Sequence, residues 1–257
     1  MMHVARRRFG QHFLHDRHVI AKIVAAIDPR AGDHMVEIGP GQGALTAPLL
    51  DRLEVLHAIE IDRDLIQSLL ARFDARRLMI HEGDALEFDF ARLPRPLRIV
   101  GNLPYNISTP LLFHLARFSD RIVDAHFMLQ KEVVDRMVAR PSTPDYGRLS
   151  VTLQARFDMA RLFVVGAGAF TPAPKVESAI VRMRPLAPSP LIAKIEPLFQ
   201  SVVTRAFTQR RKTLRNALAG VADPTLLAAL GIDPGLRPEA LPVDAFVRIA
   251  AALADNY

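Results

Sequence analysis

Short apolar runs rich in β-branched residues alternate with helix-like patterns along roughly the first 185 residues of the chain. This alternation predicts a parallel sheet with crossover helices, because parallel neighbours need a long connection and a helix usually supplies it. Seven such runs suit one doubly wound sheet. We expect its strands at residues 35–38, 55–61, 78–81, 98–101, 125–129, 162–165 and 179–183.

Apolar residues at helical spacing predict the helices. A lead-in helix follows Asp16, a suitable N-cap, and ends at Pro29. Thr109 followed by Pro110 predicts a cap and a first-turn proline. The apolar faces predicted for the lead-in helix and for a second helix over 64–73 are Ile20, Ile23, Val24 and Ile27, and Ile66, Leu69, Leu70 and Phe73.

A proline-rich segment over 184–190 predicts the domain boundary, since its three prolines disfavour both helix and central strand. We therefore expect one domain over residues 1–186 and a second over 187–257. No strand-like run follows the boundary, and the pattern from residue 244 onward is helical. The C-terminal domain is predicted to be small and all-helical.

Composition narrows the class of protein. Of 257 residues, 50% are hydrophobic and 23% charged, and no apolar run reaches 18 residues, so a disordered chain and a membrane span are excluded. Cysteine is absent, which excludes thiolate chemistry and disulfides. The N-terminus lacks the apolar core of a secretory signal, so we expect a cytoplasmic protein. The net charge of +6 suggests a polyanionic partner.

A glycine turn follows the first predicted strand in Glu37-Ile38-Gly39-Pro40-Gly41. Glycine permits the sharp turn and a close approach of ligand to backbone. Gly39, Gly41 and Ala44 also satisfy the spacing of the dinucleotide fingerprint, so this motif alone leaves a nicotinamide or flavin cofactor open.

Two acidic residues are candidates for holding a nucleoside. Glu60 ends the second strand 21 residues after Gly39, the distance at which a carboxylate meets ribose hydroxyls. Asp62 competes for this role. Asp84, after the third strand, can accept a hydrogen bond from an exocyclic adenine amine, although a helix cap is an equally good interpretation.

The segment Asn102-Leu103-Pro104-Tyr105 follows the fourth strand, where open α/β sheets bind ligands. Asn supplies an acceptor, Pro fixes the backbone and Tyr offers a flat face for stacking a base. Together they suit an exocyclic amino group such as adenine N6. Its delocalised lone pair becomes available when acceptors take hydrogen bonds from both of its N–H groups.

These motifs, in this order, resemble those of class I S-adenosylmethionine-dependent adenine-N6 methyltransferases. More narrowly, the chain resembles the small-subunit (16S) ribosomal RNA adenine dimethyltransferases, the KsgA or RsmA family, over essentially its whole length. The blocks that carry this resemblance are residues 8–14, 127–132, 146–150, 170–176 and 210–216.

The resemblance implies a Rossmann-like seven-stranded sheet with a small C-terminal all-α domain, and S-adenosyl-L-methionine as cofactor. It places the cofactor against Gly39 and Gly41, its ribose on Glu60, its adenine at Asp84 and Asn102 beside both cofactor and target base. His12 and Leu14 would close over it. The family usually carries Asn where this chain has His12, so we expect a backbone contact there. No metal site is expected.

The target base must leave its stack to reach the methyl group, and we predict that Tyr105 and Phe170 flank it. Phe170 has a core position as its alternative, since Ala167 and Ala169 beside it are apolar. Catalysis is thus assigned to Asn102, Leu103, Pro104, Tyr105 and Phe170.

Two acid-free basic stretches are predicted to bind RNA. On one helix, Arg211 and Arg215 would share a face while Leu214 and Leu218 face the core. The predicted RNA-binding residues are Arg6, Arg7, Arg8, Arg205, Arg210, Arg211, Lys212 and Arg215.

The resemblance implies dimethylation of two adjacent adenosines in the 3′-terminal hairpin of 16S rRNA, late in 30S assembly, by a monomeric protein that binds immature 30S subunits and no membrane. Three alternatives stay open. They are an antibiotic-resistance methyltransferase of large-subunit RNA, an assembly factor that mainly binds subunits, and a nicotinamide enzyme, the last disfavoured because no hydride-transfer site is recognisable.

Overall fold

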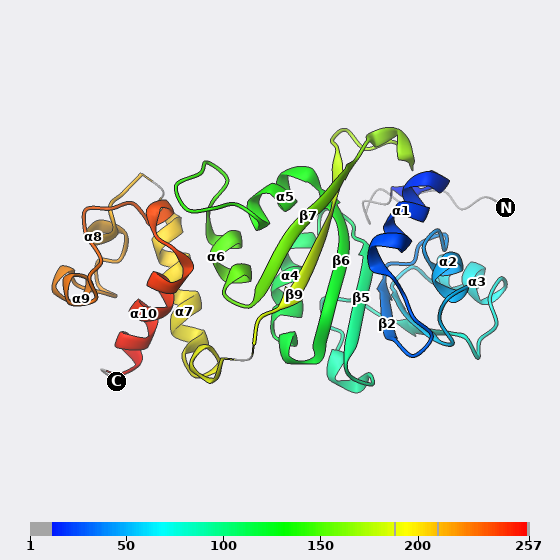
Figure 1. Cartoon of the computed structure of the whole chain (residues 1–257), viewed down its shortest axis with the longest axis horizontal. Coiled ribbons are helices and arrows are strands. Elements are labelled where there is room, and N and C mark those ends of the chain that lie inside the picture. Colours follow the sequence, from blue (N-terminus) through cyan, green and yellow to red (C-terminus); the bar gives the residue numbers. More distant parts are fainter. Residues whose placement is uncertain (1–11, 188, 210, 256–257) are drawn as a thin grey trace. The chain divides into compact units, whose positions relative to one another are not determined.

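The computed structural model describes residues 12–187, 189–209 and 211–255, and the chain divides into two compact units (Figure 1). The sheet unit comprises Met1–Val134 and Met159–Pro185. The helical unit comprises Asp135–Asp158 and Leu186–Tyr257. The chain thus crosses from one unit to the other three times: after Val134, before Met159, and after Pro185 in the proline-rich segment. Sequence periodicity gave no indication that residues 135–158 would join the helical unit.

A seven-stranded mixed sheet forms the sheet unit, which confirms the predicted fold class. The strand order is β4-β3-β2-β5-β6-β9-β7, and the first five are parallel while β9 runs antiparallel to β6. All seven predicted strands are present, most of them a residue or more longer than predicted. Their bounds are β2 His34–Ile38, β3 Leu56–Glu60, β4 Leu78–Glu82, β5 Leu97–Asn102, β6 Ile122–Gln130, β7 Phe157–Val165 and β9 Ser178–Pro185.

Two short strands, β1 (Phe13–Leu14) and β8 (Phe170–Thr171), pair antiparallel as a separate two-stranded sheet. Neither was predicted, because two residues are too few to show a period of two. Their pairing sets Leu14 opposite Phe170. The segment before α1 is thereby attached to the segment between β7 and β9.

Helices connect the strands of the sheet unit as predicted, with two corrections. Asp16 caps α1 by accepting from the backbone N–H groups of His18 and Val19. In α3, however, Leu70 is 44% exposed, since the helix ends there and Leu65 takes its place in the core. Helix α4 begins at Ser108 after Ile107, so Thr109 is not its cap. The bounds are α1 Arg17–Ile27, α2 Thr46–Leu50, α3 Arg63–Leu70, α4 Ser108–Ala116 and α5 Lys131–Met137.

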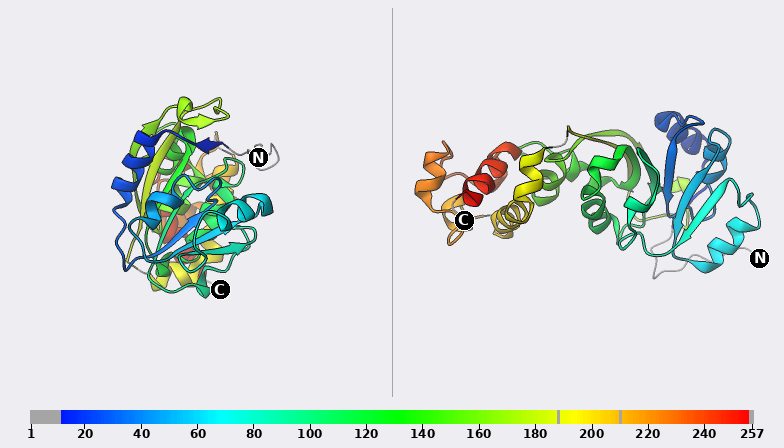
Figure 2. Two further views of the ribbon diagram at one scale, coloured as in Figure 1. Left: turned by 90° about the vertical axis from the view of Figure 1, so that its right-hand side faces the viewer. Right: turned by 90° about the horizontal axis from the view of Figure 1, so that it is seen from below.

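The core of the sheet unit lies on both faces of the sheet. Ile23 and Ile27 of α1 and Leu49 of α2 pack in one cluster with Met35 and Val100 of the strands. Helix α4 lies behind the sheet in Figure 1, and its Leu111, Leu112 and Leu115 are fully buried. Figure 2 shows the strongly twisted sheet between these helices. This two-sided burial fixes the ends of the parallel strands, where the loops of interest begin.

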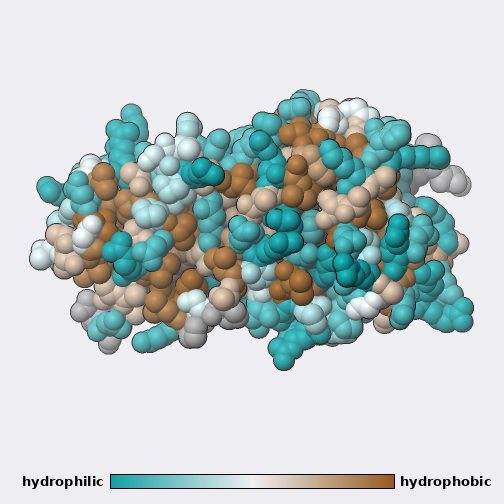
Figure 3. Space-filling view, viewed as in Figure 1, coloured by the Kyte–Doolittle hydropathy of each residue, from teal (hydrophilic) through white to brown (hydrophobic). Residues whose placement is uncertain are grey.

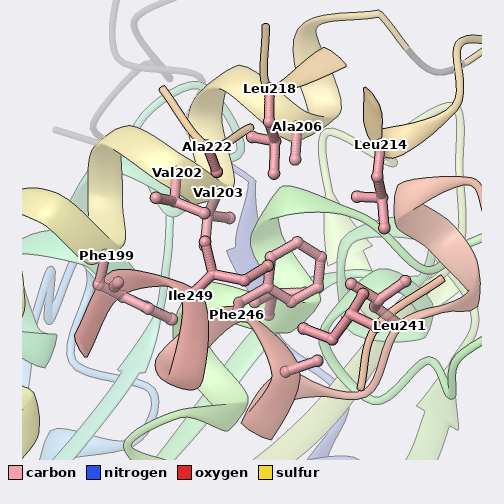
Figure 4. Packing of buried hydrophobic residues seen from close by; sticks show 14 of the residues in the cluster. Phe199, Val202, Val203, Ala206, Leu214, Leu218, Ala222, Leu241, Phe246 and Ile249 are labelled. Carbon is pink, nitrogen blue, oxygen red and sulfur yellow. The ribbon is translucent and has the colours of Figure 1, made fainter. Parts of the chain in front are cut away.

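The helical unit packs around α7 and α10 (Figure 4). Phe199, Val202 and Val203 of α7 meet Phe246 and Ile249 of α10 in one buried cluster. Between residues 186 and 255, the described part of the chain contains helices and turns but no strand, as predicted. The bounds are α6 Arg148–Gln154, α7 Pro190–Thr208, α8 Leu214–Ala217, α9 Pro224–Ala229 and α10 Val243–Ala254.

The predicted helix that carries both Arg211 and Arg215 is wrong. Helix α7 ends at Thr208, and α8 begins only at Leu214, so Arg211 lies in the intervening turn. Leu214 and Leu218 are fully buried, as predicted, and both arginines are exposed.

Hydrophilic side chains cover much of the face shown in Figure 3, with apolar ones interspersed. Among the residues described, no helix combines the length and hydrophobicity needed to cross a membrane.

Candidate active site

A cavity of about 260 Å³ opens at the carboxyl ends of β2, β3 and β5 in the sheet unit. Its wall brings together the glycine turn, the strand-end acids and the segment after β5. The predicted cofactor and catalytic residues that line it are His12, Leu14, Gly39, Gly41, Glu60, Asp84, Asn102, Leu103, Pro104 and Tyr105.

The cavity lies here because the strand order reverses between β2 and β5. From β2 the chain continues to β3 on one side, whereas β5 lies on the other, and crevices form where successive connections diverge in this way. Gly101 allows the two strands to approach closely at that point. A Cβ atom at residue 101 would lie 2.6 Å from the Ile38 carbonyl oxygen.

The turn after β2 has the backbone that its glycines predict. Gly39, Gly41 and Gly43 have φ angles of +67°, +57° and +80°, a region that side chains with a Cβ rarely adopt. A Cβ atom at residue 41 would also touch the Phe13 ring at 3.4 Å. The glycines thus shape a wall made largely of backbone, against which a ligand can lie closely.

Glu60 faces this turn from the end of β3. Its Oε1 accepts from the N–H groups of Ile61 and Asp62 at 2.9 Å each, and its Oε2 accepts from Gly41 N–H at 3.3 Å. Burial raises the pKa of this carboxyl group, and the three backbone donors partly oppose the rise. A carboxylate has about four acceptor positions, so Oε2 retains one for a ligand hydroxyl.

The other two acidic residues, Asp62 and Asp84, differ in whether they line the cavity. Asp62 caps α3, with Oδ1 accepting from Asp64 N–H at 3.1 Å, and it does not line the cavity. Glu60 is therefore the better placed of the two competing residues. Asp84 does line the cavity; its Oδ1 accepts from Leu86 N–H at 2.9 Å, so the turn geometry and a ligand-binding role coexist.

Asn102 is held by its side-chain amide. Its Nδ2 donates to the backbone carbonyl of His12 at 3.0 Å, which fixes the orientation of the amide and leaves Oδ1 as an acceptor beside the cavity. The carbonyl of Pro104 is occupied, since Ile107 N–H and Ser108 Oγ donate to it. Among the described residues, none donates to the Leu103 carbonyl, which is a second available acceptor.

Tyr105 and Phe170 occupy different environments. Tyr105 is half-buried in the cavity wall, and its ring centroid lies 5.6 Å from that of His12. Phe170 is only 3% exposed, packs in the core with Leu14 and does not line the cavity. The structure therefore brings only Tyr105 of the predicted aromatic pair to the site, because β8 turns Phe170 toward the core.

The sequence analysis missed Glu37, which also lines the cavity. It is 2% exposed, and its Oε2 accepts from Thr46 Oγ1 at 2.6 Å. Burial raises the pKa of Glu37 to about 7, opposed by the Thr46 hydrogen bond and increased by the charge of Glu60. A carboxyl group within an otherwise apolar strand was the signal that could have identified it.

Of the predicted RNA-binding residues that the structure describes, none is among the residues that line the cavity. Four of them are exposed in the helical unit: Arg205, Arg211, Lys212 and Arg215. Arg205 donates to the Ala219 carbonyl at 2.9 Å. Arg6, Arg7, Arg8 and Arg210 lie outside the residues that the structure describes.

The charges of the cavity distinguish between cofactors. Its wall contains three carboxyl groups, from Glu37, Glu60 and Asp84, and no Lys or Arg among the residues described. With the carboxyl groups of Glu60 and Asp84 and no basic side chain among these residues, such a site favours a cationic ligand such as the sulfonium S-adenosylmethionine over a dinucleotide with an anionic pyrophosphate. Glu60 offers an acceptor for ribose and Asp84 one for adenine, so the residues present fit S-adenosylmethionine. Within residues 12–187, 189–209 and 211–255, no three His, Asp or Glu side chains form a metal-binding group.

Comparison with known proteins assigns the chain to a family. The family model described as "Ribosomal RNA adenine dimethylase" matches residues 2–255. A protein of Chromobacterium violaceum named ribosomal RNA small subunit methyltransferase A is 60% identical over 255 residues, covering 99% of this chain and 97% of that protein. A protein of the same name from Aromatoleum aromaticum is 62% identical, covering 98% and 95%.

Solved structures agree with the fold. A dimethyladenosine transferase from Plasmodium falciparum has a TM-score of 0.80 at 26% identity, covering 93% of this chain and 96% of that one. The 23S rRNA methyltransferase ErmE has a TM-score of 0.69 at 27% identity, covering 95% and 99%. Since the family model spans nearly the whole chain and two relatives share 60% and 62% identity with it, this chain belongs to the ribosomal RNA adenine dimethylase family.

Proposed function

We propose that this methyltransferase transfers methyl groups from S-adenosylmethionine to the N6 amines of two adjacent adenosines in the 3′-terminal hairpin of 16S rRNA. The observation that carries the proposal is the fixed orientation of Asn102. Because Nδ2 donates to the His12 carbonyl, Oδ1 is left to accept a hydrogen bond from an exocyclic amine.

The chemistry needs acceptors more than a base. The N6 lone pair of adenine is delocalised into the ring, and hydrogen bonds accepted from both N–H groups favour its release toward an electrophile. For each methyl group that the amine gains, it loses one N–H proton to solvent. Asn102 Oδ1 and the Leu103 carbonyl are the two acceptors that we assign to the amine. When bound, S-adenosylmethionine supplies the electrophilic methyl group, and the wall contributes alignment of donor and acceptor.

The first methylation leaves one N–H on the amine, so a single acceptor suffices for the second transfer. One of the two acceptors, Asn102 Oδ1 or the Leu103 carbonyl, then no longer receives a hydrogen bond from the amine. The same wall therefore supports two successive transfers without rearranging its own hydrogen bonds.

Stacking holds the extruded base. Tyr105 presents its ring beside the acceptors, and stacking on an aromatic side chain contributes on the order of 1–3 kcal/mol per base. This offsets much of the few kcal/mol lost on unstacking. A second stacking surface from Phe170 stays a prediction, since that ring would have to leave the core.

The small-subunit substrate is favoured over the large-subunit one by degree of similarity. The relatives at 60% and 62% identity are named for the small subunit, whereas the large-subunit enzyme ErmE shares 27% identity. We further propose that the enzyme acts in the cytoplasm as a monomer on immature 30S subunits late in their assembly.

An Asn102→Ala variant tests the proposal. Incubated with labelled S-adenosylmethionine and immature small subunits, it should lose methyl transfer at least 100-fold, while it binds subunits as the wild type does. If the variant transfers methyl groups at the wild-type rate, Asn102 is not the acceptor. Loss of subunit binding together with activity would also contradict its assignment to the chemical step. Thermal unfolding and circular dichroism verify that the variant is folded.

A further inference from the structure

Ser178 contacts Tyr105 of the site, but neither the predicted motifs nor the mechanism above assigns Ser178 a role. It is the first residue of β9 and is completely buried. Its Oγ shares a hydrogen bond of 2.7 Å with the hydroxyl group of Tyr105, 73 residues away in the chain. We propose that Ser178 is a positioning residue that holds the Tyr105 ring in the orientation required to stack the target adenine.

The anchor is rigid. Ser178 pairs with Gln130 at the end of β6, and the residue before it is held because Lys131 N–H donates to the Glu177 carbonyl at 2.9 Å. The Ser178 hydroxyl thus belongs to the sheet. Tyr105, by contrast, belongs to the loop after β5, whose backbone is held mainly at Leu103 and Pro104.

Tyr105 needs this anchor because its ring would otherwise rotate about the Cα–Cβ and Cβ–Cγ bonds. The hydroxyl hydrogen bond fixes the far end of the ring, while the neighbouring His12 ring limits it from another side. His12 is itself held, since its Nδ1 lies 2.7 Å from the Pro172 carbonyl. The ring orientation is therefore set by two groups that come from the start of the described chain and from β9.

The hydrogen-bond partner of Ser178 argues against a merely structural hydroxyl group. A buried serine could satisfy its hydroxyl on a nearby backbone carbonyl, as Ser108 and Ser150 do in this chain. Ser178 instead bonds to Tyr105, an aromatic residue of the cavity wall. Burial raises the pKa of Tyr105, and the hydrogen bond with Ser178 partly opposes the rise.

A double-mutant cycle tests the inference, which rests on the proposed stacking role of Tyr105. Ser178→Ala and Tyr105→Phe each remove the same hydrogen bond and keep the ring. We expect each to lower kcat/KM for RNA about ten-fold, equivalent to about 1.4 kcal/mol, with S-adenosylmethionine affinity unchanged. The double variant should be no slower than either single one, because the bond is already absent.

The matched control is Ser150→Ala. Ser150 is also completely buried and hydrogen-bonded, to Gly147 N–H and the Arg136 carbonyl, but it lies in the helical unit. We expect it to lower stability while kcat/KM per folded molecule stays at the wild-type value. Ser178→Ala should lower kcat/KM even where its fraction folded equals that of this control.

Three outcomes would overturn the inference: wild-type kcat/KM in Ser178→Ala, wild-type kcat/KM in Tyr105→Phe, or effects of the two changes that multiply in the double variant. The Tyr105→Phe result can overturn the inference even if Ser178→Ala does not fold. Tyr105→Ala separates the inference from the proposed function. If removing the whole ring leaves activity intact, the stacking role fails; if it abolishes activity while both single variants are normal, only the role of Ser178 fails.

Discussion

Glu37 carries a buried carboxyl group whose protonation state depends on the fold. Burial raises its pKa from 4.5 to about 7, so the folded state favours the protonated form. A group with a raised pKa contributes stability below its unfolded pKa and loses that contribution as pH rises through the folded pKa.

Glu37 should therefore make the protein less stable as pH rises from about 4.5 to 7. At about 1.4 kcal/mol per pH unit over that range, the loss approaches roughly 3 kcal/mol. Urea unfolding of the wild type and Glu37→Gln between pH 5 and 8 measures it. Gln keeps an acceptor for Thr46 and does not titrate, so the free energies of unfolding should diverge as pH rises. Parallel curves would show that Glu37 titrates normally.

At the scale of the elements, the cavity depends on the close approach of β2 and β5 at Gly101. A Cβ atom there would lie 2.6 Å from a backbone oxygen of β2 and 2.9 Å from Leu103 Cδ2. Because backbone cannot move aside as a flexible side chain can, the strands would have to separate where Asn102 enters the site.

Gly101→Ala should lower the free energy of unfolding by about 1–3 kcal/mol, the range typical of overpacking, and weaken cofactor binding. The control is Gly32→Ala, since a Cβ atom at residue 32 meets nothing within 4 Å. Thermal unfolding and calorimetry compare the two. Equal stability of the two variants would show that the close approach is not required.

How far the elements could be predicted follows from their length and surroundings. Buried strands such as β2 and β5 show continuous apolar runs, so their positions and the edge at which the site forms were predictable. The pair β1–β8 is too short to show periodicity, and it turns Phe170 toward the core. The hydrogen bond between Tyr105 and Ser178 depends on β9 lying beside β6, which local pattern does not specify.

At the scale of the whole molecule, we propose that charge is divided by task. The cavity of the sheet unit carries three carboxyl groups, whereas the helical unit exposes the four described basic residues of the acid-free stretch, Arg205, Arg211, Lys212 and Arg215. The net charge of +6 therefore does not describe the catalytic wall, which suits a cationic cofactor.

Neutralising Arg211 and Arg215 to Gln should weaken binding to small subunits. If both contact phosphates, the magnitude of the slope of log K against log salt falls by about 1.4 to 1.8. Arg248→Gln is the control, because this exposed arginine of α10 is already paired with Asp244 at 2.9 Å. A slope that is unchanged in the double variant would remove the two arginines from the interface.

Mapping of modified nucleotides on ribosomal RNA tests the central claim most directly. Small subunits that lack the modification are incubated with the wild type and S-adenosylmethionine, and their RNA is analysed by mass spectrometry. We predict N6,N6-dimethyladenosine at two adjacent positions in the 3′-terminal hairpin, absent with Asn102→Ala. Dimethyladenosine only in large-subunit RNA, or in neither RNA, would contradict the account.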